Sequence, residues 1–79
     1  MLIRSQNREV LINFNSMADA EISEGPIKTI ITSYITGCSY LLGEYSTKAK
    51  AMKVLDMIQE AYVNGHIDYQ MPVDGSVEV

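Results

Sequence analysis

The sequence predicts an α+β fold, in which an antiparallel sheet of about five strands (two hairpins plus a connecting strand) precedes one C-terminal amphipathic helix and a short extended tail. Two observations favour this fold. Strand-forming residues dominate 1–45, and apolar residues recur at helical spacing through 46–64. The chain has 79 residues, which suits a single domain. We therefore expect a sheet at 1–45, a helix at 46–64 and an acidic tail at 65–79.

Residues 2–14 are predicted to form the first hairpin, with Gln6 and Asn7 as a two-residue turn. This register places Arg4 opposite Glu9, so that opposite charges meet across the two strands. The hairpin would present one apolar side to the core.

A connecting strand is predicted over 17–23, because apolar and polar residues alternate there. One side carries Ala18, Ala20 and Ile22, and the other carries Asp19, Glu21 and Ser23. This pattern is typical of a half-buried strand near the edge of a sheet. The next turn is expected at Glu24-Gly25-Pro26, where glycine gives the backbone freedom and proline stops strand pairing.

Residues 27–45 are predicted to form the second hairpin, because β-branched residues are dense in its first strand. Gly37 suits the first central position of a type II′ turn, which would place Ile35 opposite Tyr40. Both faces of the hairpin are then apolar. One face carries Ile30, Tyr34, Leu41 and Tyr45, and the other carries Ile31, Ile35, Tyr40 and Leu42.

A single helix covers only one face of such a sheet. We predict that the other face forms the interface of a homo-oligomer, through Ile31, Ile35, Tyr40 and Leu42. A small domain also gains stability from a partner, and the lone Cys38 excludes an intrachain disulfide. The alternative is a barrel-like curl that buries both faces within one chain.

The helix is expected to begin after Ser46 as N-cap and to end at Gly65. Its apolar positions form one stripe, which we expect to dock on the sheet face that carries Ile30, Tyr34 and Tyr45. The stripe consists of Ala51, Val54, Leu55, Ile58, Ala61 and Tyr62.

Lysines crowd the first turns of this helix, where the helix dipole is positive and acidic residues would be favoured. With the free amides of the first turn, they supply the ingredients of a pocket for a phosphate or a carboxylate. The candidate ligands are Ser46, Thr47, Lys48 and Lys50, joined by Arg4 and Arg8 if the fold or a second subunit brings the first hairpin close. No Gly-rich loop makes this pocket specific, and the alternative is a solvated lysine cluster.

Composition argues against several other functions. The net charge of −4 opposes binding to nucleic acid and to anionic membranes, and no apolar run is long enough to span a bilayer. A single Cys38 and a single His66 do not make a zinc site within one chain, and nothing spaces them as nucleophile and base. We therefore predict a protein that is not an enzyme and that has no metal and no cofactor. The N-terminal residues lack the apolar run of a signal peptide, which favours an intracellular setting.

Several segments resemble small uncharacterised proteins encoded by phages and prophages of Gram-positive bacteria. They are MLIRSQ at 1–6, LGEYST at 42–47, KAMKVLDMIQEAY at 50–62, QMP at 70–72 and VEV at 77–79. The resemblance covers about half of the chain and leaves the middle, 13–40, unmatched. It implies an accessory protein that acts in the cytoplasm of a bacterial host, and it transfers no functional residue.

Three functions stay open at this point. The first is a phage accessory protein that binds a host factor, such as an inhibitor of a host defence protein. The second is a homo-oligomeric sponge that sequesters a nucleotide-like anionic signal. The third is a structural or assembly component of the phage particle. After Lys53 the chain has acidic residues but no Lys or Arg, which suits either a basic partner or a solvated surface.

Overall fold

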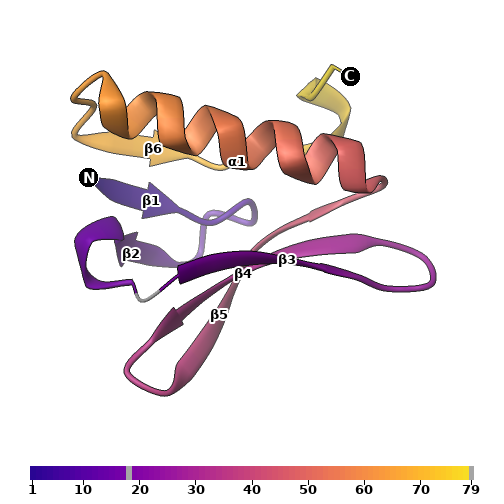
Figure 1. Ribbon diagram of the computed structural model, residues 1–79, viewed down its shortest axis with the longest axis horizontal. Coiled ribbons are helices and arrows are strands. Elements are labelled where there is room, and N and C mark those ends of the chain that lie inside the picture. Colours follow the sequence, from indigo (N-terminus) through magenta and orange to yellow (C-terminus); the bar gives the residue numbers. More distant parts are fainter. Residues whose placement is uncertain (18, 79) are drawn as a thin grey trace.

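The computed structural model describes residues 1–17 and 19–78 of the chain. Within these residues, six strands form two three-stranded sheets, accompanied by one α-helix and two short 3-10 helices (Figure 1). The α+β class is therefore confirmed, whereas the prediction of one sheet of about five strands is wrong. No helix in this part of the chain is both long and apolar enough to cross a membrane.

The first sheet has the strand order β2-β1-β6, and the second has the order β3-β4-β5. Figure 1 shows α1 along one side of the molecule and the β4–β5 hairpin extending away on the other side. In chain order, the elements are β1 (Leu2–Arg4), β2 (Leu11–Asn13), η1 (Phe14–Ser16), β3 (Asp19–Glu24), β4 (Thr29–Ile35), β5 (Cys38–Tyr45), α1 (Lys48–Val63), β6 (Asp68–Gln70) and η2 (Asp74–Ser76).

The β1–β2 hairpin forms as predicted, but its register differs from the prediction by two residues. Arg4 lies opposite Leu11 rather than Glu9. The loop is wider than a two-residue turn because the Asn7 carboxamide accepts hydrogen bonds from the Glu9 N–H at 3.0 Å and from the Ser5 hydroxyl at 2.6 Å. A shift of two residues keeps each side chain on its predicted face, since side chains alternate with a period of two.

Residues 65–78, the described part of the predicted tail at 65–79, do not form an extended tail. β6 pairs in parallel with β1, and the side chains of Met71 and Val77 are only 1% and 5% exposed. The prediction failed because polar residues separate these apolar positions, and because their packing partners lie far away in the sequence. Val79 lies outside the described residues.

β3 is an edge strand, and its alternation follows the prediction. The half-buried residues are Ala20 and Ile22, and the exposed residues are Asp19, Glu21 and Ser23. The prediction for Ala18 falls outside the described residues. β3 therefore has one face toward the core and one polar, acidic face.

The β4–β5 hairpin is confirmed, but its turn type and register are not. Thr36 and Gly37 have φ angles of 47° and 81°, which is the pattern of a type I′ turn rather than a type II′ turn. Gly37 takes the second central position, and Ile35 therefore lies opposite Cys38 rather than Tyr40.

A β-bulge in β5 changes which residues share a face of this hairpin. Pairing passes from Thr32–Leu41 to Ile31–Gly43, so Leu42 has no partner in β4. Beyond the bulge, every side chain of β5 lies on the face opposite to the one that a regular strand would give it.

Tyr45 consequently lies in the core with Ile31, although the predicted pairing placed these two residues on opposite faces. The ring of Tyr45 lies across Gly43, where an added Cβ would come within 3.0 Å of ring atoms. The bulge and the glycine together make room for this buried tyrosine.

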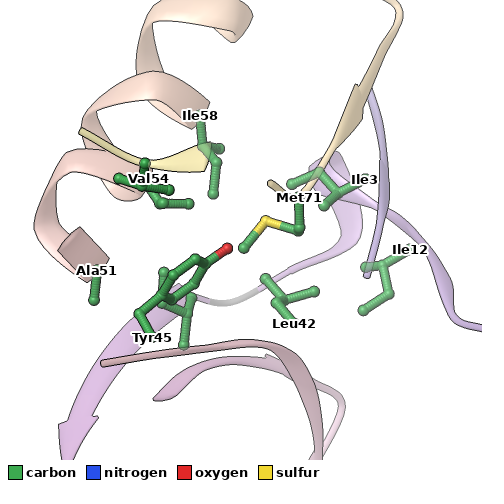
Figure 2. Close-up of a cluster of buried hydrophobic side chains, with 10 residues drawn as sticks. Ile3, Ile12, Leu42, Tyr45, Ala51, Val54, Ile58 and Met71 are labelled. Atoms are coloured by element: carbon green, nitrogen blue, oxygen red, sulfur yellow. The ribbon is translucent and has the colours of Figure 1, made fainter. Parts of the chain in front are cut away.

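The core lies between the two sheets and α1. Figure 2 shows Tyr45 and Met71 near its centre, between Val54 and Ile58 of α1 and Ile3 of β1. Its buried members are Ile3, Ile12, Ile31, Leu42, Tyr45, Ala51, Val54, Ile58, Met71 and Val77.

The predicted apolar stripe of α1 is confirmed along most of its length. Ala51, Val54, Ile58 and Ala61 are buried. Leu55 is half-buried, and Tyr62 is 50% exposed. The stripe therefore reaches the core, but its last aromatic residue stays at the surface.

The prediction for the first residue of α1 is wrong by one position, and the prediction for its end is confirmed. Thr47 rather than Ser46 is the N-cap, since its hydroxyl accepts from the Lys50 N–H at 3.1 Å. Gly65 ends the helix as predicted, with a φ of 76°. The next N–H donates to the carbonyl of Ala61 at 3.0 Å, which completes a Schellman motif.

We expect Gly43→Ala to lower the free energy of unfolding by about 1–3 kcal/mol, because the new methyl group would overlap the ring of Tyr45. The matched control is Gly75→Ala, since an added Cβ there meets no atom within 4 Å. Urea denaturation followed by circular dichroism measures both. Equal stability of the two variants would show that Tyr45 does not occupy this position.

Met71→Ala is expected to cost about 2–5 kcal/mol of stability, because it leaves a cavity at the centre of the core. The control is Val73→Ala, two residues away, where the side chain is 59% exposed and the expected change is within about 0.5 kcal/mol. The same denaturation experiment separates them. A neutral Met71→Ala would mean that the C-terminal segment is a tail after all.

Candidate functional site

The start of α1 does bind an anion, and that anion belongs to the chain itself. The Asp74 carboxylate accepts hydrogen bonds from the Ser46 N–H at 2.8 Å and from the Ser46 hydroxyl at 3.1 Å. Lys50 Nζ lies 3.5 Å from the second carboxylate oxygen and donates to the Asp74 carbonyl at 3.2 Å. Asp74 therefore occupies the part of the predicted pocket that Ser46 and Lys50 form.

The surroundings of Asp74 favour its charged form. The hydrogen bond from the Ser46 backbone N–H is the largest cause that lowers the pKa of Asp74. Desolvation, the next largest effect, opposes it, and the Ser46 hydroxyl and Lys50 lower the pKa further. A carboxylate whose pKa is lower in the folded state stabilises the fold above its unfolded pKa. This contribution is lost as the pH falls through the folded value.

The remaining candidates for the anion pocket are directed elsewhere. Lys48 forms an ion pair with Glu24 at 3.5 Å. Arg4 Nη1 donates to the Arg8 carbonyl at 3.0 Å within the first hairpin. No hydrogen bond or ion pair among the described residues joins either arginine to the start of α1. Of the predicted ligands, only Ser46 and Lys50 contact the Asp74 carboxylate, whereas the Thr47 hydroxyl caps the helix by accepting from the Lys50 N–H.

The predicted subunit interface is divided between the core and the surface. Ile31 and Leu42 are 0% and 1% exposed within their own chain, so these two assignments are wrong. Ile35 packs against the core, and only Tyr40, at 40%, is well exposed. The reason is that the first sheet and α1 cover this face within one chain, and the bulge places Leu42 and Tyr45 on it beside Ile31.

A groove at the other end of α1 is the more open site. It lies between α1, η1 and the start of β3, and its volume is about 300 Å³. Most of its lining is apolar, and Asp19 and Gln59 supply polar groups. The lining consists of Phe14, Met17, Asp19, Ala20, Leu55, Ile58, Gln59 and Tyr62.

Two aromatic rings form one end of the groove. The ring centroids of Phe14 and Tyr62 are 5.1 Å apart, and the ring planes are tilted by 38°. Tilted pairs at this distance are favourable for aromatic side chains. Tyr62 is half exposed, so it can contact a bound molecule without leaving Phe14.

The sequence pattern does not predict this groove, because it places Phe14 at the end of a strand. Phe14 instead begins η1, whose N-cap is Asn13, with a side-chain oxygen that accepts from the Asn15 N–H at 3.0 Å. An asparagine side chain that accepts from the backbone N–H two residues later is a common turn signal, so Asn13 is the residue that points to the short helix. The helical spacing likewise predicts that Tyr62 docks on the sheet, because nothing in the sequence indicates that it contacts Phe14.

The single cysteine and the single histidine of the chain do not line this groove. Cys38 is exposed at the start of β5, and His66 is exposed just after α1. Within 1–17 and 19–78, no group of three or more His, Cys, Asp and Glu residues is arranged to hold a metal ion.

Asp74→Asn is expected to lower the melting temperature at pH 7, because the charge that faces Ser46 and Lys50 is removed. The difference from wild type should shrink as the pH falls below the ordinary carboxyl pKa of 3.8, since wild-type Asp74 then also loses its charge. Melting curves between pH 2 and pH 7 test this. The control is Asp56→Asn on the exposed side of α1. An equal effect of both substitutions would show that the contact of Asp74 with Ser46 and Lys50 does not stabilise the fold.

Comparisons of this chain with protein-family models, with curated proteins and with solved structures find no match. The resemblance to phage and prophage proteins therefore stays a prediction from the sequence. What the structure adds is the groove at α1, the acidic edge beside it and the internal anion at Ser46.

Proposed function

We propose that this chain is a non-enzymatic accessory protein of a phage or prophage, which binds a protein in the cytoplasm of its bacterial host. Inhibition of a host defence protein is the activity to test first. The observation that carries the proposal is the apolar groove between α1, η1 and β3. The resemblance of the sequence to small phage proteins supplies the biological setting.

The composition of the groove supports a protein partner. Aromatic residues in a desolvated pocket dominate the energetics of many interfaces, and Phe14 and Tyr62 provide such a pair. A volume of about 300 Å³ accommodates one or two apolar side chains rather than a large cofactor. We therefore expect the partner to insert an apolar side chain beside Tyr62.

Charge defines the partner further. The chain carries a net charge of −4, and Asp19 lies in the wall of the groove. The exposed Glu21 follows on the same face of β3. A complementary partner surface is basic around its apolar anchor, and opposite charges would speed the encounter of the two proteins.

The alternative of a sponge for a nucleotide-like anion loses its main structural support. The Ser46 N–H and hydroxyl and the Lys50 ammonium already bind Asp74, so an external anion at these groups would have to displace its carboxylate. A role in phage assembly is left as an alternative that the capture experiment below also addresses.

Immobilised wild-type protein should capture a host protein from bacterial lysate, and Tyr62→Ala should weaken that binding by about 2 kcal/mol, or about 30-fold. The matched control is Tyr40→Ala, which removes a similarly exposed tyrosine outside the groove. Affinity is measured by titration with the purified partner. Circular dichroism checks that both variants are folded.

Two results would contradict the proposal. One is a bait that recovers no host protein, and the other is equal capture by both tyrosine variants. Stabilisation of the protein by cyclic nucleotides, lost in Lys50→Ala, would instead favour the anion sponge.

A further inference from the structure

The edges of the two sheets are protected to different degrees. β2 and β6 are edge strands of only three residues each, and short edges offer little backbone for pairing. β5 is longer, with eight residues, but another part of the chain occupies part of its edge.

Gln6 forms hydrogen bonds with the backbone of β5 at the positions where a neighbouring strand would pair. Its backbone N–H donates to the Leu42 carbonyl at 2.7 Å. Its side-chain amide accepts from the Glu44 N–H at 2.9 Å and donates to the Glu44 carbonyl at 3.0 Å. This leaves only the end of β5 next to the turn open to a partner.

β3 is the longest edge without such cover. It has six residues, and its ladder joins it to β4 over all six. Among the described residues, no backbone hydrogen bond links the strand to any element other than β4. The outer row of its N–H and C=O groups is therefore available to an added strand.

The two faces of β3 prescribe what such a strand should carry. Ala20 belongs to the inner face and to the wall of the groove, next to α1. Asp19, at the rim of the groove, and Glu21 alternate with Ala20 and lie on the outer face, opposite Tyr34 and Thr32 of β4. A strand beside β3 alternates in the same way, so one set of its side chains would reach the groove and the other set would lie beside the two carboxylates.

The acidic side chains of β3 favour pairing with a strand of another protein over pairing with β3 of a second copy. Glu24 has Lys48 as its ion-pair partner, but none of the ion pairs among the described residues includes Asp19 or Glu21. If β3 paired with β3 of another copy, carboxylates would meet carboxylates, which is destabilising. Lysine or arginine at the facing positions would be favourable.

We infer that the host protein adds an extended segment of alternating apolar and basic residues to β3, with apolar side chains in the groove and basic ones beside Asp19 and Glu21. This inference rests on the proposed function and specifies how the partner is recognised. Such strand addition takes its affinity from main-chain hydrogen bonds and its specificity from alternate side chains.

The test uses three synthetic ten-residue peptides and the full chain labelled with ¹⁵N. One peptide alternates Leu with Lys, the second alternates Leu with Glu, and the third has the composition of the first in two blocks. The alternating Leu-Lys peptide should slow amide exchange in β3 and bind about tenfold more tightly than the other two. Slowed exchange elsewhere only, or none with about 1 mM peptide, would overturn the inference.

A charge reversal provides the matched control. Glu21→Lys should weaken binding of the Leu-Lys peptide and strengthen binding of the Leu-Glu peptide, whereas Glu60→Lys on α1 should change neither by more than about twofold. Equal effects of the two substitutions would contradict pairing at β3. Protection of β3 in a dimer without peptide would contradict it as well, since self-pairing would then be the use of this edge.

Failure of this inference can be told apart from failure of the proposed function. If Tyr62→Ala abolishes capture of a host protein and that protein leaves β3 unprotected, the function stands and the added strand is wrong. If the Leu-Lys peptide protects β3 but no host protein is captured, the edge is a peptide site and the proposed function falls.

Discussion

The parallel pairing of β6 with β1 is the constraint on which the rest of the structure depends. It directs the segment after α1 back across the core, where Met71 becomes one of the most deeply buried side chains. It also brings the Pro72 carbonyl to the Tyr45 hydroxyl, which donates to it at 2.8 Å. Burial raises the pKa of Tyr45, so the phenol stays neutral and keeps its role as a donor. Asp74 then reaches the start of α1 as part of the same segment.

The features that follow from local pattern were predictable. The buried stripe of α1 and its end at Gly65 depend on residues within one or two turns, and the alternation of β3 depends on adjacent residues. Registers were not predictable in this way. A single side chain, Asn7, widens the first loop, and one unpaired residue, Leu42, inverts the faces of β5. Neither effect is visible in hydrophobic periodicity, because both arise from specific hydrogen bonding and packing.

The candidate sites also divide into a part that the local sequence predicts and a part that depends on the tertiary structure. Reading the start of α1 as an anion-binding site was physically sound, since its amide and hydroxyl donors and Lys50 do gather around a carboxylate. The source of that carboxylate could not be foreseen without knowing that Asp74 returns to the helix. The groove at Phe14 and Tyr62 joins residues that are distant in the sequence, and each had a plausible position within the core. Only the tertiary structure shows that they meet at the surface.

The β1–β6 pairing also has a kinetic consequence. It joins Leu2 to Asp68, so the first sheet cannot be completed during synthesis until the ribosome has made the chain through β6. Contacts between residues so distant in sequence are slow to form, because the entropy of closing the intervening loop is lost before the contacts compensate. The β3–β4–β5 meander has short connections and can form earlier. Nascent chains would therefore expose the meander, with its open acidic edge, before Met71 arrives to complete the core.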